Sequence, residues 1–493
     1  MIKISDIFKT DDKKLSALYG GARSSLLGAV KPFGDYNLAV SGSESDRVTL
    51  ASEIMSAETL GRYDIESAID CISAFAATQR DDGRLASAVF RKKEGIFCDY
   101  GGLAGLCFAE EALSLFYMTK KKELIYLDKL YDMLEKFDDY LWITHDINGN
   151  GFVELLDQSE TVEGDFAPRY TPTEIFSGGK EKEVSPFPAE LVSVSAFCYR
   201  LKKTLAEISS IIGNGRAEAY EEEANQIKKG IRSYFWNPQK SACYDRDFKS
   251  RAMETLTADN IAAMYYGAFE QDMADEFLKK HLLNENEFFT YLPLPSLSAS
   301  DKVFSNDANI RWGGQVMGIT YRQAVRAFEK YGFYSEFTRV AKRFLDSVSG
   351  SMAYTEQYDP FTGAPIKEKI CADYAPTASA VLEIIARFYG VSVVFDDVVW
   401  GCLGHEGDNF SEYEYKWGSD VYRLSAEKNT STGFLNGKLL FTVTNGVRVT
   451  TDWFGNNPVV VNVTDEPLDA VFVYRDKTFS FTAEPGKPME FKM

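Results

Sequence analysis

The chain has 493 residues, a net charge of −19 and a pI of about 4.8. Its length allows about two to four domains, and a hydrophobic share of 45% with 14% aromatic residues supports a large packed core. So acidic a surface repels phosphate backbones and anionic lipids. We therefore expect neither a nucleic-acid partner nor membrane binding.

The residues with the most distinctive side-chain chemistry are few. The N-terminal stretch "MIKISDIFKTDDKK" lacks the apolar segment of a signal peptide, and no run of about 18 apolar residues occurs. The seven cysteines form no CxxC pair, which is typical of buried thiols in a reducing cytosol and predicts a cytoplasmic location. His145, His281 and His405 lie far apart, so a zinc site or a histidine triad is not expected and chemistry must rest mainly on carboxylates.

Helical spacing of apolar residues continues through roughly the first 390 residues. In "IESAIDCISAFAATQR", for example, Ile65, Ala68, Ile69, Ile72 and Phe75 fall on one stripe. The predicted helices lie near 13–30, 44–61, 65–80, 103–119, 121–143, 188–212, 216–235, 257–270, 271–283, 313–331, 334–349 and 373–389. Joined in pairs, they form six helical hairpins, and we expect a mainly α fold in which these close into an (α/α)6 toroid.

The pattern changes after Val391. Short runs such as "KLLFTVT", "VRVTTDWF", "PVVVNVT", "AVFVYR" and "TFSFTA" are rich in Val, Thr, Phe and Tyr and alternate with turns. They predict antiparallel strands. We therefore place an (α/α)6 barrel domain of catalytic type at 1–391 and a β-sandwich-like domain at 392–493.

Several stretches of the helical region resemble a known family. Three stretches are similar to motifs of glycoside hydrolase family 63, above all its bacterial mannosylglycerate-hydrolase-like branch. They are "GRYDIESAIDCISAFAATQRDDGRL", the long segment that starts at "ADNIAAMYYGAF", and "SMAYTEQYDPFTGAP". The resemblance spans about residues 50–390. It implies an (α/α)6 barrel that cleaves glycosidic bonds with inversion, here of α-linked glucosides or mannosides of short length.

Inverting cleavage needs two carboxyl groups roughly 6.5–9.5 Å apart, one to protonate the leaving oxygen and one to activate a water. The resemblance implies that Asp165 in "EGDFAPRY" is the acid and that Glu356, which opens the Tyr-Asp-Pro motif, is the base. The alternative for Asp165 is a structural loop acid that pairs with Arg169. The alternative for Glu356 is an acid at a helix terminus with no catalytic role. The resemblance further implies substrate contacts by Trp312, Gln315, Arg169 and Tyr358.

The sequence departs from the family pattern at sugar-contact positions. A Trp-Asp pair is replaced by Ala51-Ser52, and the platform "RWGGQVM" keeps Trp312 but has Gly313 where the family has Arg. That change removes a planar donor for which the sequence offers no local replacement of similar shape. Two explanations fit: a different sugar, or a non-hydrolytic sugar-binding protein on the same barrel. A sugar epimerase ranks third, because no histidine falls in a barrel-mouth motif.

The segment "HDINGNGFVELLD" has the spacing of a calcium loop. Counting from Asp146, oxygen ligands fall at the expected positions, with a glycine at the sixth and an acid at the twelfth. An ordinary Asn-Gly turn is the alternative. No cofactor is required by the expected chemistry, but a structural calcium ion is a prediction for Asp146, Asn148, Asn150, Glu154 and Asp157.

Overall fold

The fold is known from a computed structural model of the chain. It describes residues 2–42, 44–92, 95–103, 108–161, 163, 168–170, 173–177, 180–366, 373–405 and 409–491. Asp165 lies outside the described residues, as do Cys107 and Cys371.

Each of the twelve predicted helices is confirmed, although several begin later than expected. Their bounds are α1 Lys13–Gly28, α2 Ser52–Leu60, α3 Ile65–Ala77, α4 Ala109–Met118, α5 Leu124–His145, α6 Val192–Ile212, α7 Ala217–Gly230, α8 Asp259–Tyr266, α9 Gln271–Phe277, α10 Gly318–Glu329, α11 Tyr334–Ser351 and α12 Ala375–Tyr389. Local chemistry explains several of these ends. Asp12 and Asp64 cap α1 and α3 by accepting backbone N–H bonds, and Gly213 and Gly267 end α6 and α8 in left-handed conformations.

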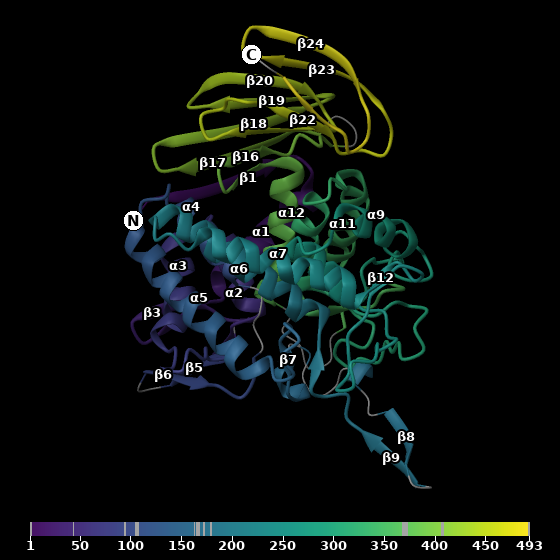
Figure 1. The fold of residues 1–493 in the computed structure, drawn as a ribbon. Helices are drawn as coiled ribbons and strands as arrows, with labels where there is room; N and C mark the ends of the chain where they lie inside the picture. The colour runs from purple at the N-terminus through teal and green to yellow at the C-terminus, as the bar shows by residue number, and fades with distance from the viewer. Residues whose placement is uncertain are drawn as a thin grey trace.

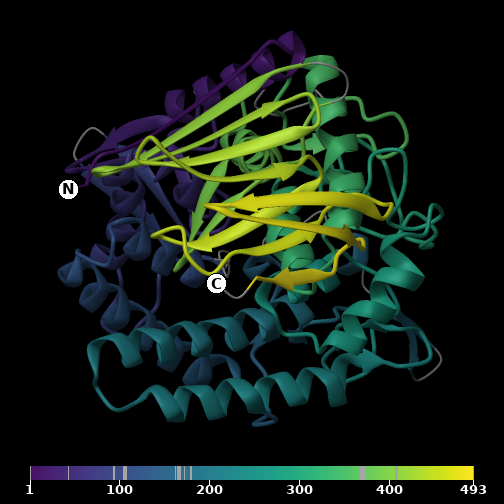
Figure 2. The same cartoon turned by 90° about the horizontal axis from the view of Figure 1, so that it is seen from above.

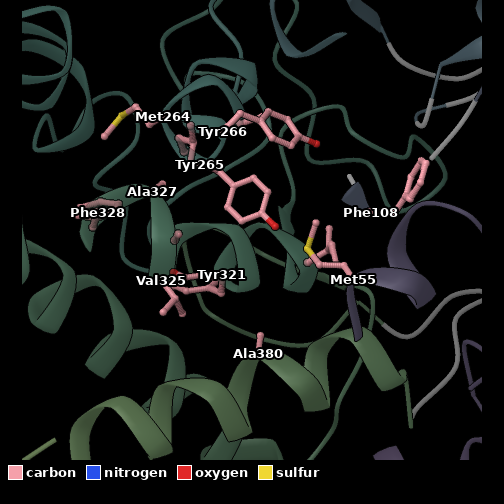
Figure 3. Close-up of a cluster of buried hydrophobic side chains, with 14 of the residues drawn as sticks. Met55, Phe108, Met264, Tyr265, Tyr266, Tyr321, Val325, Ala327, Phe328 and Ala380 are labelled. Atoms are coloured by element: carbon pink, nitrogen blue, oxygen red, sulfur yellow. The ribbon is translucent and has the colours of Figure 1, made fainter. Parts of the chain in front are cut away.

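Six helices form an inner ring. Helices α2, α4, α6, α8, α10 and α12 each contact the next, and α12 contacts α2, which closes the ring. Helices α1, α3, α5, α7 and α11 pack against its outside. Figure 3 shows Met55, Tyr265, Tyr321 and Ala380, from four of the inner helices, gathered in the core of the ring. This arrangement is the one expected of six helical hairpins.

The C-terminal part forms two antiparallel sheets, so the chain is mixed rather than mainly α (Figures 1 and 2). One sheet has the order β1-β17-β18-β19-β20-β23-β24 and the other β15-β16-β21-β22-β25. Their bounds are β1 Ile4–Thr10, β15 Val391–Val394, β16 Asp397–Trp400, β17 Ser411–Trp417, β18 Asp420–Glu427, β19 Thr430–Leu435, β20 Lys438–Thr444, β21 Val447–Asp452, β22 Val459–Asn462, β23 Leu468–Tyr474, β24 Lys477–Ala483 and β25 Pro488–Glu490.

The predicted domain boundary needs one correction. Strand β1 lies at the N-terminus, yet it pairs along its whole length with β17, from Ile4 opposite Trp417 to Thr10 opposite Ser411. The β unit therefore consists of the C-terminal region and the first strand of the chain. A strand that pairs across 400 residues leaves no local signal of its partner in the sequence.

The remaining strands form small sheets at the rim of the barrel and at its end opposite the two large sheets. They are β2 Val30–Phe33 with β3 Tyr36–Ala39; β4 Arg47–Thr49, β5 Ala88–Lys92 and β6 Gly95–Asp99; β7 Glu154–Leu155 with β10 Ala189–Glu190; β8 Thr173–Ser177 with β9 Lys180–Val184; β11 Trp236–Asn237 with β12 Ala242–Cys243; and β13 Val316–Met317 with β14 Gln357–Tyr358. In Figure 1, β8 and β9 project away from the body at the end opposite the sandwich.

The sandwich covers the C-terminal ends of inner helices. Arg62, just beyond α2, is buried and donates to the Asp6 carboxylate at 3.0 Å, to Ser392 Oγ at 2.9 Å and to Tyr413 Oη at 2.7 Å. Trp417 donates to the carbonyl of Met118 at the end of α4. The N-terminal ends of the inner helices thus lie at the end of the barrel opposite the sandwich. Within the described residues, no helix is both long and apolar enough to cross a membrane.

Candidate active site

A cavity of about 90 Å³ lies at the N-terminal ends of three inner helices. Ser193 and Val194 of α6, Asp259 and Ala262 of α8, and Thr320 and Gln323 of α10 form one wall. The other wall includes Trp312 and the residues Leu155, Glu160, Thr161, Glu163, Arg169 and Tyr170. The volume is enough for several ordered waters. The two residues nearest to Asp165 in the described chain, Glu163 and Pro168, belong to or adjoin this wall.

Arg169 lies in the cavity wall and is held by three carboxylates. Its guanidinium pairs with Glu163 at 2.8 Å, with Asp245 at 3.1 Å and with Asp259 at 3.1 Å. Asp245 also accepts a bond from the backbone N–H of Val192 at 2.9 Å, at the start of α6. The expected role of Arg169 in binding substrate stays a prediction. In the described chain its guanidinium donors are directed at these three carboxylates.

The cluster around Arg169 is acidic and poorly solvated. Burial raises the pKa of Glu163 to about 7 and that of Asp245 to about 6, although Arg169 opposes both shifts. Burial disfavours charge on Arg169 too, but the carboxylates of Asp259 and Glu163 raise its pKa well above the ordinary value. Carboxyl groups in such surroundings keep their protons to higher pH than in water.

Glu356 lies just before β14, and its side chain is 13% exposed. Its carboxylate forms an ion pair with Arg311, and its backbone carbonyl accepts from the N–H of Gly318 at 2.9 Å, at the start of α10. Arg311 is the neighbour of Trp312, which lines the cavity. The loop that ends at α10 thus connects the predicted base to the cavity wall.

Three predicted substrate contacts lie in or beside this loop. Trp312 adopts a left-handed φ of 60°, and its indole Nε1 is buried without a partner among the described residues. The residue itself lines the cavity. Gln315 is buried and bonds to the backbone of Ser305, Asp307 and Gly313. Tyr358 is buried too.

Gln315 and Tyr358 have their polar groups engaged inside the protein. The hydroxyl of Tyr358 donates to the carbonyl of Ala353 at 2.6 Å and accepts from the N–H of Thr355 at 3.1 Å. Neither side chain lines the cavity in the described part of the chain. Direct contact with substrate stays a prediction for both, while their observed bonds hold the loops that carry Trp312 and Glu356.

The predicted calcium loop is compact. Glu154 accepts from the backbone N–H groups of Ile147 and Asn148, and Glu190 accepts from the side-chain amides of Asn148 and Asn150 at 2.9 and 2.6 Å. The second carboxylate oxygen of Glu190 is buried without a partner in the described chain. Two carboxylates and two amides therefore meet here, and rotation of the amides would direct their oxygens inward.

Other features of this loop fit a metal less well. Asp157, the predicted twelfth ligand, instead accepts from Ser159 N at 2.8 Å and caps the short 3-10 helix Gln158–Glu160. Asp146 accepts only a long bond, 3.4 Å, from Gly151 N. In the described residues no group of three or more His, Cys, Asp and Glu side chains is placed to hold a metal. Calcium binding stays a prediction, with Glu190 as the ligand that the sequence did not suggest.

The three histidines lie away from the cavity lining. His145 faces Glu160 at 3.4 Å behind the wall, His281 pairs with Glu287 at 2.5 Å, and His405 stacks on Tyr389. The five described cysteines are free thiols. Within the described residues no histidine or cysteine lines the cavity, whereas the carboxyl groups of Glu160, Glu163 and Asp259 do.

Comparison with known proteins gives the family. Residues 54–375 match the family described as the mannosylglycerate hydrolase MGH1-like glycoside hydrolase domain. The chain belongs to this glycoside hydrolase family. The match covers the inner ring from α2 to the start of α12 and includes Glu163, Arg169, Trp312 and Glu356.

Solved structures share the fold at lower sequence identity. The GH63 mannosylglycerate hydrolase from Thermus thermophilus in complex with glucose is 16% identical, with a TM-score of 0.60 over 74% of this chain and 99% of that one. An alpha-L-rhamnosidase from Dictyoglumus thermophilum is 14% identical, with a TM-score of 0.59 over 88% of this chain and 44% of that one. These likenesses concern the fold.

A periplasmic trehalase of Escherichia coli O1:K1 / APEC is 36% identical over 97 residues. That match spans 19% of this chain and 17% of the trehalase.

Proposed function

We propose that the chain is an inverting glycoside hydrolase that acts on short α-linked glucosides or mannosides. Asp165 donates a proton to the leaving oxygen as the glycosidic bond breaks. Glu356 takes a proton from the water whose oxygen attacks the anomeric carbon from the other side. The observation that carries the proposal is the placement of Glu163 and Arg169, on either side of Asp165 in sequence, in the wall of the cavity beside Trp312.

The described residues close to Asp165 in sequence support the role of an acid. A general acid must hold its proton near neutral pH, which burial or neighbouring carboxylates bring about. Glu163 is two residues before Asp165, and its carboxyl group has a pKa raised to about 7 by burial. Asp245, which pairs with the same Arg169, has a pKa raised to about 6.

The test is a screen of α-glycosides scored by release of reducing sugar, with proton NMR of the first product anomer. Asp165→Asn and Glu356→Gln should each abolish turnover, and the product should first appear as the β anomer. Glu276→Gln, an exposed acid on α9, is the matched control and should turn over like the wild type. Wild-type rates in both site variants would refute the assignment.

A second candidate is a sugar-binding protein that does not cleave its ligand. It is favoured by the engagement of Arg169, Gln315 and Tyr358 inside the protein, which leaves fewer groups to distort and hold a sugar in the transition state. Such a protein would bind an oligosaccharide in calorimetry and release no product from the same panel. The cytoplasmic location stays a prediction, which fractionation of the producing cells would test.

A further inference from the structure

We propose that Arg311 is a positioning residue for Glu356, two residues away from the position at which the family pattern has an arginine. The inference rests on the proposed function, because it concerns the group named there as the base. Arg311 is two residues before Gly313, and its guanidinium contacts the Glu356 carboxylate directly. The donor that is missing at position 313 is thus supplied from the neighbouring turn.

Gly313 itself has no room for a side chain. A Cβ atom there would lie 2.8 Å from Ile310 Cγ2 and 2.9 Å from the carbonyl oxygen of Ser305, closer than real Cβ contacts. Gly314 has a φ of 147°, and a Cβ there would lie 2.4 Å from the ring of Phe304. An arginine at 313 is incompatible with this loop. In this loop conformation a guanidinium can therefore come from position 311 but not from position 313.

The loop that presents Arg311 is held on its inner side. The amide oxygen of the buried Gln315 accepts from Gly313 N at 2.9 Å, and its nitrogen donates to the carbonyl of Asp307 at 2.7 Å. The backbone N–H of Ser305 donates to the carbonyl of Gly313 at 2.7 Å. Such fixing of both ends of a turn limits the positions of the guanidinium, as a positioning residue requires.

Arg311 faces a second carboxylate and a phenol. Glu356, Tyr374 and Glu53 all favour its charged form and raise its pKa, against the effect of burial. Glu53, near the start of α2, is buried and accepts from Ser41 Oγ at 2.5 Å and Thr49 N at 2.9 Å. Its own acceptors are thus engaged by neutral donors, while Glu356 is the carboxylate that contacts the guanidinium.

The proposed role follows from the needs of a base. Glu356 must point one oxygen at the water and stay in place while a proton arrives. A guanidinium on its other oxygen fixes the carboxylate rotamer. The side chain of Arg311 is 48% exposed and that of Glu356 13% exposed, so the pair lies at the solvent side of the site. It supports orientation; the pair is too exposed to be a major source of stability.

The experiment uses α-D-glucosyl fluoride and α-D-mannosyl fluoride with the full chain, and measures fluoride release. Fluoride leaves with little help from an acid, so its release reports on the base side. Arg311→Met should lower kcat by about 10²-fold, the loss typical of a misplaced group, with KM unchanged. Arg311→Lys should restore part of the rate, and guanidinium chloride should rescue Arg311→Ala where equal sodium chloride does not.

Two controls separate positioning from a general effect. Arg339→Met removes an arginine that is 44% exposed and pairs with Asp465 of the sandwich at 3.7 Å, and kcat should not change. In the Glu356→Gln background, Arg311→Met should cause no further loss, because residues that act as a unit are not additive.

The outcomes distinguish the inference from the proposed function. If Glu356→Gln abolishes release while Arg311→Met keeps the wild-type kcat, the inference is overturned and the proposed function stands. If the wild type releases no fluoride, or Glu356→Gln is fully active, the proposed function fails and the inference falls with it. Loss of kcat in Arg311→Met with rescue by guanidinium supports both.

Discussion

Replacement of Arg169 by methionine should destabilise the protein strongly, and more at pH 8 than at pH 5. The guanidinium is 2% exposed and is the cation shared by Glu163, Asp245 and Asp259. Methionine keeps much of the side-chain volume but leaves the buried carboxyl groups of Glu163 and Asp245, and the partly buried one of Asp259, without their cation. Removal of one partner from a buried ion pair costs about 3–5 kcal/mol, and we expect a loss in that range at pH 8.

The pH dependence follows from the two raised pKa values. Folding raises the pKa of Glu163 from 4.5 to about 7 and that of Asp245 from 3.8 to about 6. The folded chain therefore binds more protons than the unfolded chain between about pH 4 and pH 7, and this contribution to stability is lost as the pH rises through that window. For Glu163 alone the shift corresponds to about 3 kcal/mol. Without Arg169 the ionised carboxylates of Glu163 and Asp245 are less stable still. Protonation of these groups at pH 5 should therefore reduce the loss of folding stability in the variant.

The assay is thermal melting followed by circular dichroism at pH 5 and pH 8, beside a matched control. Arg232→Met makes the same change at an arginine that pairs with Glu270 and Asp272 but is 40% exposed. Exposed pairs contribute about 0–1 kcal/mol, so this control should melt close to the wild type. The reasoning is refuted if Arg169→Met melts like the control, or if its deficit is no smaller at pH 5 than at pH 8.

Three further changes test other parts of the structure. Gly313→Ala should lower both the melting temperature and turnover, because its Cβ meets backbone, whereas Gly350→Ala in α11 meets nothing within 4 Å and should leave turnover unchanged. Arg62→Met should cost about 3–5 kcal/mol by leaving Asp6 buried without its cation, and wild-type melting would contradict the junction described above. Calcium should raise the melting temperature of the wild type but not of Glu190→Gln; equal shifts in both would argue against the loop as the site.

The sequence predicts the barrel well because its signals are local. Apolar spacing within each helix gives the twelve segments, and "TEQYDP" gives Glu356, since each pattern is complete within a few residues. The pairing of β1 with β17 and the contact of Arg169 with Asp245 join residues 400 and 76 positions apart, and neither pair shares a motif. Such partners are set by how the helices pack, which a single sequence does not display.

The burial of predicted contacts has a similar origin. Gln315 and Tyr358 lie in the motifs expected to touch sugar, and polar side chains in such motifs are equally suited to fixing a loop. Whether such a side chain contacts sugar or holds a loop depends on whether nearby backbone groups need a hydrogen-bond partner. Gln315 satisfies the turn that ends at Gly313, and Tyr358 satisfies the chain at Ala353 and Thr355. The need for those bonds becomes visible only when the loops are folded.

Two charged groups that the family pattern leads one to expect are absent at their exact positions but present close by. The aspartate expected at Ser52 is absent, but the next residue, Glu53, is a buried acid. The arginine expected at Gly313 is absent, but Arg311 supplies a guanidinium, and its charged form is favoured by both Glu53 and Glu356. An acid near position 52 and a guanidinium near position 313 are thus both present in this chain, and the guanidinium contacts Glu356, which supports the proposed hydrolysis over binding alone.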